Sequence, residues 1–310
     1  MKKKTFAKVL SLALAALMLF ALCACGAAET PAAEPTAVPA ADAPASESPA
    51  ETEAPAESQG VLDQIKADGV LYVTLSPDFA PMEFVDSSKD GQEQYVGLDV
   101  FLAKYIADYI GVKLVIEPMS FDACQTAVYT ASVPMSVSGY VWTEERAESY
   151  EISDYYYDGD NKIESVILIR TADEEKYTSS EDFNGVDIGA QNASLQMQLV
   201  TSQLPDANPV AVGDVGTGVL ELQNGSIEAL AVAKGNAEII MDANPDLVLC
   251  PWEFTITEET EAFVILITKG ETALLNVVNE ALAKAYSEGM YGAWHDEAVA
   301  LAKVVNGTEE

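Results

Sequence analysis

Between Val61 and Glu310, short apolar runs alternate with segments whose apolar residues recur at helical spacing. The spacing predicts amphipathic helices over Leu98–Ile110, Leu195–Leu204, Thr217–Gln223 and Thr272–Ser287, the last closed by Gly289. Buried strands are predicted over Val70–Leu75, Lys113–Met119, Val166–Arg170, Val186–Ala190, Ile227–Val232 and Ala262–Thr268. This alternation predicts an α/β fold of mostly parallel sheets flanked by helices. Because 250 residues are many for one such sheet, we expect two lobes.

The N-terminus has the pattern of an export signal. Three lysines at positions 2–4 precede an uncharged apolar run over residues 9–24, which is too short to argue for a permanent transmembrane helix. The run ends in Leu22-Cys23-Ala24-Cys25-Gly26, which resembles the lipobox of bacterial lipoproteins. We therefore predict a lipoprotein signal peptide over residues 1–25, with lipidation of Cys25. The alternative is an ordinary cleaved signal that happens to contain two cysteines.

A linker is expected over residues 26–60. It contains 12 Ala, 6 Pro and 7 acidic residues, no basic residue, and only Val38 as a larger aliphatic. Such a segment buries too little apolar surface to offset its ordering entropy, so the composition predicts a disordered, extended tether.

Charge and composition exclude several function classes. The 16 basic and 50 acidic residues give a net charge of −34, and removal of four lysines with the signal peptide leaves −38. Such a field repels phosphate backbones, which argues against a nucleic-acid partner. One His and four scattered Cys provide no zinc-ligand spacing, and we expect no metal and no cofactor. His295 is predicted on a C-terminal helix, in a surface or packing role.

Nine short motifs follow one another in a recognisable order. They are Val61–Gly69, Val70–Ser76, Phe79–Phe84, Val96–Val100, Met119–Asp122, Thr143–Arg146, Ser153–Tyr157, Ile188–Asn192 and Gly289–Tyr291. In this order they resemble the family 3 extracellular solute-binding proteins, the polar amino-acid receptors of ABC importers. The resemblance spans residues 61–305.

The resemblance implies a two-lobed periplasmic-binding-protein fold of type II. Lobe 1 is expected over residues 61–155 and 255–310, and lobe 2 over residues 156–254, with two crossing strands as a hinge. It further implies a non-enzymatic monomer, and the lipobox-like sequence at Cys25 predicts that this monomer is lipid-anchored on the outer face of the cell membrane. That monomer would deliver a small polar solute, an amino acid or related carboxylate, to an ABC permease and its ATPase.

Arg146 leads the ligand-binding residues that the resemblance implies. It stands in Thr-Glu-Glu-Arg, where the family's arginine clamps the solute carboxylate through a bidentate fork. The alternative is a surface arginine paired with Glu144 or Glu145. Phe79 and Phe121 are expected to form aromatic walls of the pocket, although either aromatic is also compatible with the core.

Two loops complete the predicted site. Ser138, Gly139 and Tyr140 match a loop that offers backbone groups to the ligand. Ala193 and Ser194 precede a helix in lobe 2, whose N-terminus suits a carboxylate, although Ser194 is also an ordinary N-cap.

Departures from the family pattern affect specificity. Ala233 stands where relatives place the aspartate that receives the solute's α-ammonium, and Val141 replaces a hydroxyl residue. We therefore expect arginine and lysine to bind poorly, unless another acid such as Glu83 or Asp78 takes over. Lys234, next to Ala233, either favours a more acidic solute or is a solvated residue.

Other functions stay open at this stage. One alternative is a sensory binding protein for a signalling partner. Another is a dehydratase-like enzyme on the same scaffold, although no nucleophile or metal motif supports it. Cys124 and Cys250 are expected in different lobes as buried free thiols.

Overall fold

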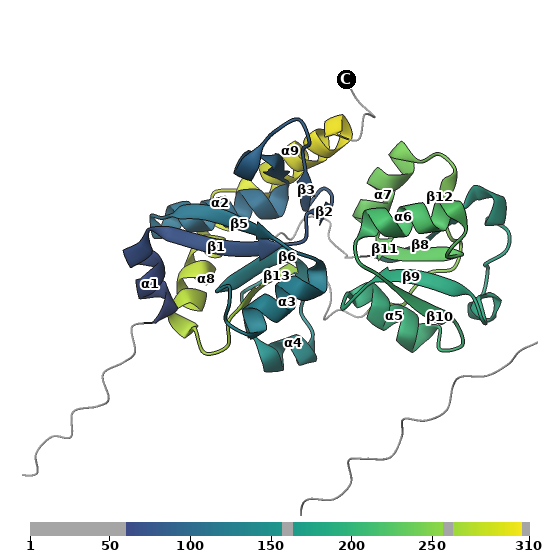
Figure 1. Ribbon diagram of the computed structural model, residues 1–310, viewed down its shortest axis with the longest axis horizontal. Coiled ribbons are helices and arrows are strands. Elements are labelled where there is room, and N and C mark those ends of the chain that lie inside the picture. Colours follow the sequence, from purple (N-terminus) through teal and green to yellow (C-terminus); the bar gives the residue numbers. More distant parts are fainter. Residues whose placement is uncertain (1–59, 157–163, 257–262, 306–310) are drawn as a thin grey trace, which may run out of the picture. The chain divides into compact units, whose positions relative to one another are not determined.

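The computed structural model describes residues 60–156, 164–256 and 263–305 (Figure 1). The predicted signal peptide, Cys25 and nearly all of the predicted linker lie outside these ranges. Within them, no helix is long and apolar enough to span a membrane.

Lobe 1 is built around a five-stranded sheet in the order β5-β1-β6-β13-β7. Its strands are β1 (Val70–Leu75), β5 (Lys113–Pro118), β6 (Met135–Val141), β7 (Glu151–Ile152) and β13 (Phe263–Ile267). A small antiparallel sheet joins β2 (Asp78–Phe79), β3 (Glu83–Val85) and β4 (Tyr95–Val96). The helices are α1 (Val61–Asp68), α2 (Leu98–Ile110), α3 (Phe121–Tyr129), α4 (Glu144–Ser149), α8 (Thr272–Ser287) and α9 (Met290–Val305), with a 3-10 turn, η1, at Gly91–Gln94. Thus β13, which comes from the C-terminal part of the chain, completes a sheet that the N-terminal part begins.

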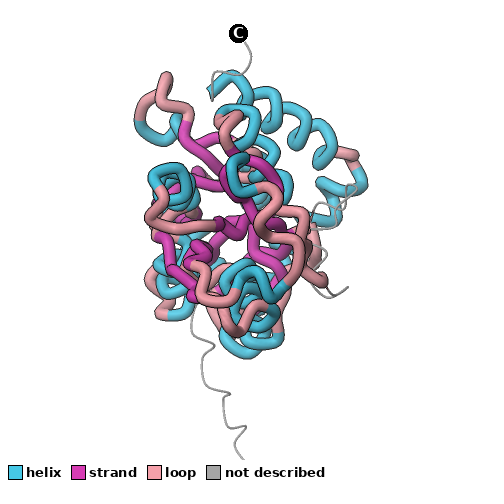
Figure 2. Tube along the Cα trace, turned by 90° about the vertical axis from the view of Figure 1, so that its right-hand side faces the viewer, coloured by secondary structure: helices cyan, strands magenta, loops and turns pink. Residues whose placement is uncertain are grey.

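Lobe 2 repeats this plan with a sheet in the order β10-β9-β11-β8-β12. Its strands are β8 (Ser165–Arg170), β9 (Asp187–Gln191), β10 (Asn208–Val212), β11 (Ala229–Ala233) and β12 (Leu247–Leu249). Its helices are α5 (Leu195–Gln203), α6 (Val215–Asn224) and α7 (Lys234–Ala243), with 3-10 turns η2 (Thr171–Asp173) and η3 (Ser180–Phe183). Figure 2 distinguishes the strands from the surrounding helices and loops by colour.

The apolar pattern explains why these segments form these elements. In α2 the residues Leu98, Leu102 and Ile106 recur at helical spacing and are fully buried, and Gly111 ends the helix in the left-handed conformation. In β13 every residue is buried, as expected for a strand covered on both faces. The α/β fold class is confirmed, and the sheets are mixed: each contains two parallel and two antiparallel strand pairs.

Parallel strand ends position the candidate site. The chain leaves β1 towards Ser76 and Asp78, leaves β9 towards Ser194, and leaves β11 at Ala233. In α/β sheets, ligands bind beside the carboxyl ends of strands. The predicted lobe limits at 155/156 and 254/255 lie beside residues outside the described ranges, so they stay a prediction.

Candidate functional site

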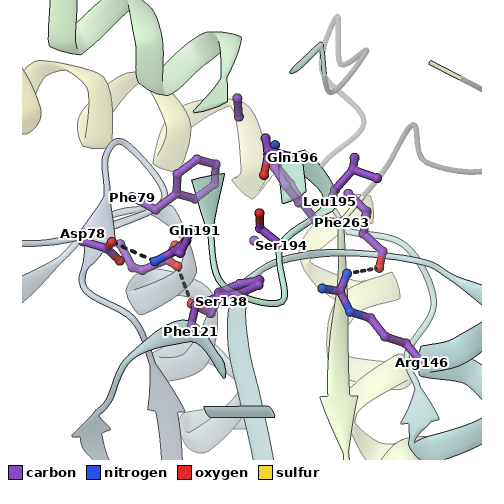
Figure 3. Close-up of a pocket in the computed structure, with 14 residues that line it drawn as sticks. Asp78, Phe79, Phe121, Ser138, Arg146, Gln191, Ser194, Leu195, Gln196 and Phe263 are labelled. Carbon is purple, nitrogen blue, oxygen red and sulfur yellow. Dashed lines mark hydrogen bonds between the residues drawn. The ribbon is translucent and has the colours of Figure 1, made fainter. Parts of the chain in front are cut away.

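One pocket is lined by residues of both lobes (Figure 3). Its lining consists of Asp78, Phe79, Glu83, Phe121, Ser138, Gly139, Val141, Arg146, Gln191, Ser194, Leu195, Gln196, Ala233 and Phe263. The cavity has a volume of about 30 Å³. That is room for a water molecule or two and far below the roughly 300 Å³ of an ordinary ligand site. A solute therefore enters only if the lining residues move apart.

Arg146 is a buried cation in this pocket. The cap of α4 positions it, because the Thr143 Oγ1 accepts a hydrogen bond from its backbone N–H at 3.2 Å. Its side chain is enclosed, with the residue only 4% exposed, and burial lowers the pKa of the guanidinium. The guanidinium donates to the carbonyl oxygens of Val141 (2.8 Å) and Ala193 (3.2 Å) and to the Gln125 Oε1 (3.4 Å). No carboxylate of the described residues pairs with it, so its charge is solvated only by neutral dipoles.

Two carboxylates line the same pocket. Glu83 is fully buried; its Oε1 accepts from the Ser138 hydroxyl at 2.5 Å, and its Oε2 has no partner in the described part of the chain. Burial, and secondarily the nearby Asp99, raise the pKa of Glu83 well above its usual value. Asp78 accepts from the Ser76 hydroxyl through Oδ1, and from the Gln191 amide (2.9 Å) and the Val215 N–H (2.8 Å) through Oδ2.

A third carboxylate supports the pocket from behind. Asp99 is fully buried beside Glu83, and burial raises its pKa to about 6. It accepts hydrogen bonds from the Gly139 N–H at 2.7 Å and the Tyr156 hydroxyl at 2.9 Å. Ser138 and Gly139 lie in strand β6 and not in the predicted loop, and Asp99 thereby fixes the part of β6 that they contribute to the pocket.

Aromatic rings enclose the pocket. Phe79, Phe121 and Phe263 line it, and the centre of the Phe121 ring lies 5.8 Å from the Arg146 guanidinium carbon. Gly139 has a φ of +54°, and a Cβ there would lie 2.7 Å from the Phe79 ring. Only glycine combines this conformation with this close approach.

Six of the predicted residues are brought together in the pocket: Phe79, Phe121, Ser138, Gly139, Arg146 and Ser194. Ser194 also caps α5, because its hydroxyl accepts from the Met197 N–H; the N-cap interpretation is confirmed, and a contact of Ser194 with a solute stays a prediction. Tyr140 and Ala193 are not part of the lining. The Tyr140 hydroxyl is hydrogen-bonded with Ser136 in the core, whereas the Ala193 carbonyl accepts from Arg146.

Lys234 is also absent from the lining. Its ammonium pairs with Glu164 at the surface, because α7 begins at Lys234 and turns the side chain to solvent. Ala233 does line the pocket. Because an alanine stands where the resemblance led us to expect an aspartate, this part of the lining carries no charge.

Sequence reasoning missed Gln191, Leu195, Gln196 and Phe263, and named Asp78 and Glu83 only as substitutes for the missing aspartate. Gln191 directly follows the predicted strand Val186–Ala190 and is the last residue of β9, and its place at the end of a buried strand was the available signal. Phe263 belongs to β13, which pairs with β6. The apolar pattern did not predict β6, so the sequence did not indicate that Phe263 lies beside it. Cys124 and Cys250 are buried free thiols, as expected. No cluster of three or more metal-ligating side chains occurs among the described residues.

Comparison with known proteins gives consistent matches. The family model for bacterial extracellular solute-binding proteins, family 3, matches residues 71–298. A relative from Campylobacter jejuni named "Probable histidine-binding protein" is 25% identical, covering 71% of this chain and 81% of its own length. The L-cystine-binding protein TcyJ of Escherichia coli is 22% identical, covering 74% and 83%.

Solved structures of amino-acid-binding proteins have the same fold as this chain. An amino acid ABC transporter substrate-binding protein from Streptococcus pneumoniae, bound to L-arginine, is 31% identical with a TM-score of 0.71, and the match covers 78% of this chain and 98% of that one. The fold, with a pocket lined by both lobes, therefore defines a type II periplasmic binding protein. The chain belongs to family 3 of the bacterial extracellular solute-binding proteins.

Proposed function

We propose that this protein binds an amino acid carrying a carboxylate and a cationic group outside the cytoplasm, and delivers it unchanged, as a monomer, to an ABC permease and its ATPase. One observation carries the proposal. Among the described residues, the pocket contains a buried arginine, Arg146, that donates only to neutral acceptors, and a buried carboxyl group, Glu83, whose Oε2 has no hydrogen-bond partner. A zwitterionic solute supplies both missing partners.

Electrostatics favour this solute class. An unpaired buried charge is costly, and a partner of opposite charge in a low-dielectric cleft offsets that cost. In the proposal, Arg146 holds the solute carboxylate in a bidentate fork, as its planar guanidinium allows. Phe79 and Phe121 enclose the apolar part of the solute. The Ser194 hydroxyl at the start of α5 lies on the same cavity and adds a polar contact.

Glu83 and Asp78 take the cation in this proposal. The neutral Ala233 favours poor binding of arginine and lysine, but two other carboxylates line the pocket, so we adopt the alternative in which they replace the missing aspartate. Arginine-bound and histidine-binding relatives are compatible with this assignment.

Calorimetry on the purified protein tests the proposal with L-arginine, L-histidine, L-cystine and agmatine, which is arginine without its carboxylate. L-Arginine should bind more tightly than agmatine. Glu83→Gln should weaken L-arginine binding by about 10- to 100-fold, since a hydrogen bond to a charged group contributes about 1.5–3 kcal/mol. The matched control Glu148→Gln removes an exposed carboxylate on α4 and should change nothing. Equal affinity for L-arginine and agmatine, or an unaffected Glu83→Gln variant, would contradict the assignment.

We also propose that a lipid on Cys25 anchors the protein to the outer face of the membrane. The lipobox-like sequence Leu22–Gly26 supports this anchor. In cells labelled with radioactive palmitate, Cys25→Ala should lose the label and the membrane association, whereas Cys23→Ala should retain both. Labelling that persists in Cys25→Ala would disprove the anchor.

A further inference from the structure

Two buried carboxyl groups lie side by side at the wall of the pocket. Glu83 of β3 and Asp99 of α2 are both fully buried. The backbone brings them together, because the Asp99 N–H donates to the carbonyl of Met82, the neighbour of Glu83, at 2.8 Å. Two successive residues of β6, Ser138 and Gly139, then donate one hydrogen bond to each side chain. The two carboxyl groups are thereby within hydrogen-bonding reach of each other.

A hydrogen bond between these two groups requires a proton. An ionised carboxylate only accepts hydrogen bonds, so two carboxylates form no bond with each other. The Glu83 Oε2 is fully enclosed, and no donor among the described residues reaches it. A buried acceptor without a donor is costly, and a proton held between the two carboxyl groups supplies the missing donor.

The surrounding donors indicate which of the two groups holds that proton. Asp99 accepts from a backbone N–H and from the Tyr156 hydroxyl, so each of its oxygens has a donor. Glu83 accepts only through Oε1, from the Ser138 hydroxyl. The Ser138 Oγ itself accepts from the Ser76 N–H at 3.0 Å, which leaves the hydroxyl proton for Glu83. Because hydrogen bonds to the ionised form favour it, Asp99 carries the charge and Glu83 the proton.

The groups that face the pair from other elements do not neutralise a second negative charge. Asp78 of β2 adds negative charge, and the Arg146 guanidinium donates to neutral acceptors. The phenols near the pair are Tyr140 of β6 and Tyr156, with Tyr291 of α9 next to Tyr156. Phenols carry no charge near neutral pH. A doubly ionised pair would therefore be strongly disfavoured in the ligand-free protein.

The pKa values agree with this arrangement. Burial raises the pKa of Asp99 to about 6 and that of Glu83 well above its usual value. One proton therefore remains on the pair after Asp99 has ionised.

We propose that Glu83 and Asp99 share one proton in the ligand-free protein, and that a cationic solute in the pocket expels it. Asp99 is thus a positioning residue, which touches no solute and acts by holding the proton on Glu83. The second step rests on the proposed function, in which Glu83 takes the cation of the solute. A positive charge beside Glu83 favours its ionised form, so the solute need not touch the enclosed Oε2. Since binding releases a proton, affinity rises with pH, by up to about tenfold per pH unit.

Infrared spectroscopy of the ligand-free protein tests the shared proton, because protonated and ionised carboxyl groups absorb at separate frequencies. Ordinary carboxyl groups are ionised at about pH 7, so a protonated one stands out. Its band should be present in the wild type and in the exposed control Glu148→Gln, and absent in Glu83→Gln. A wild-type spectrum without this band, or a band that persists in Glu83→Gln, would overturn the proposal.

Calorimetry with L-arginine tests the release. Titrations at about pH 6.5 in phosphate and in imidazole, which differ in ionisation enthalpy, give the number of protons released, and more than about half a proton per bound L-arginine is expected. Asp99→Asn offers Glu83 an amide donor in place of the proton. This variant should bind L-arginine without proton release and with an affinity that does not change with pH, whereas Asp108→Asn, an exposed control on α2, should behave like the wild type. Melting temperatures check that the variants are folded.

The outcomes separate this proposal from the proposed function. Wild-type protein that binds L-arginine without releasing a proton would overturn the proposal and leave the proposed function in place. Equal proton release from Asp99→Asn and the wild type would also overturn it. If L-arginine does not bind, the proposed function and the expulsion step both fail, and the infrared band then decides for or against the shared proton.

Discussion

The two lobes contribute different chemistry to the pocket. All ionisable residues of its lining, Asp78, Glu83 and Arg146, belong to lobe 1. The lining of lobe 2 is neutral and consists of Gln191, Ser194, Leu195, Gln196 and Ala233. In the proposed function, lobe 1 therefore carries the charges that recognise the solute, and lobe 2 carries dipoles and apolar surface that cover it.

This division has a consequence for opening and closing. Because the recognition charges are fixed on one lobe, separation of the lobes does not separate a charged pair. In the proposed function, closure instead removes water from groups that are already in place, which strengthens their interaction with the solute, and the solute cation then favours the ionised form of Glu83. Lobe 2 adds neutral hydrogen bonds, each with a modest net contribution of about 1 kcal/mol.

In the described arrangement, lobe 2 forms hydrogen bonds with two of these groups, Arg146 and Asp78. The Ala193 carbonyl accepts from Arg146, and the Gln191 amide donates to Asp78. In the proposed function, the solute replaces these neutral contacts with charged ones. The difference between a charged and a neutral partner then sets the gain in affinity.

The comparison predicts that loss of Arg146 has the largest effect. Arg146→Ala leaves the solute carboxylate unpaired in the closed cleft and should cost about 2–5 kcal/mol of affinity. Arg146→Lys should recover only part, since a point charge does not reproduce the fork. Calorimetry with L-arginine measures both. Affinity for agmatine should change far less, and an Arg146→Ala variant that binds L-arginine like the wild type would refute the assignment of charge recognition to this residue.

The second prediction concerns the stability cost of burying carboxyl groups in lobe 1. The pKa of Asp99 is raised by burial from 3.8 to about 6. Well below pH 3.8 this carboxyl is protonated in both the folded and the unfolded chain, and its stabilising contribution is complete. As the pH rises towards 6, the unfolded chain ionises first, so the contribution is lost, on the order of 2–3 kcal/mol in total.

Urea unfolding of the ligand-free protein between about pH 4 and pH 6 measures this loss. Asp99→Asn should remove that part of the pH dependence, whereas Asp108→Asn, an exposed site on the same helix α2, should leave it in place. If the two variants show the same pH dependence, the carboxyl of Asp99 is not the group that titrates.

Much of the fold was predictable because burial imposes a regular pattern. The strand at Val70–Leu75 and the helix at Leu98–Ile110 have the predicted limits, since each presents an uninterrupted apolar pattern to the core. The central strand β6 was missed: Met135–Val141 contains Ser136, Ser138 and Gly139, which interrupt its apolar run. These polar residues are buried because they hydrogen-bond, the Ser136 hydroxyl to the Thr74 carbonyl and the Ser138 hydroxyl to Glu83.

The site was less predictable than the fold. Arg146 was found because its motif resembles the family's, and the walls Phe79 and Phe121 followed from their positions in similar motifs. Gln196 and Phe263 have no such motif, and only the folded chain brings them to the pocket. Lys234 was predicted as a ligand residue but does not line the pocket, because neighbours in sequence diverge where β11 ends and α7 begins.

The third prediction tests the contribution of lobe 2. Gln191→Ala removes the hydrogen bond from the amide to Asp78. Because the donor is a neutral amide, the bond should contribute about 1 kcal/mol, so affinity for L-arginine should change by about fivefold and by no more than about tenfold. Calorimetry under the conditions used for Arg146→Ala gives a direct comparison. A loss as large as that of Arg146→Ala would mean that lobe 2 carries recognition energy of its own.

The smallest effect is expected at Lys234, the cation of lobe 2 that stands next to Ala233. Its side chain is 42% exposed and pairs with the exposed Glu164, so solvent screens the pair. Lys234→Ala should therefore change neither the affinity for L-arginine nor that for L-glutamate, and should shift stability by no more than about 0.5 kcal/mol. Lys66→Ala, at an exposed position in α1, is the matched control. If Lys234→Ala weakens L-glutamate binding while the control does not, Lys234 reaches the solute, and the assignment of all recognition charges to lobe 1 fails.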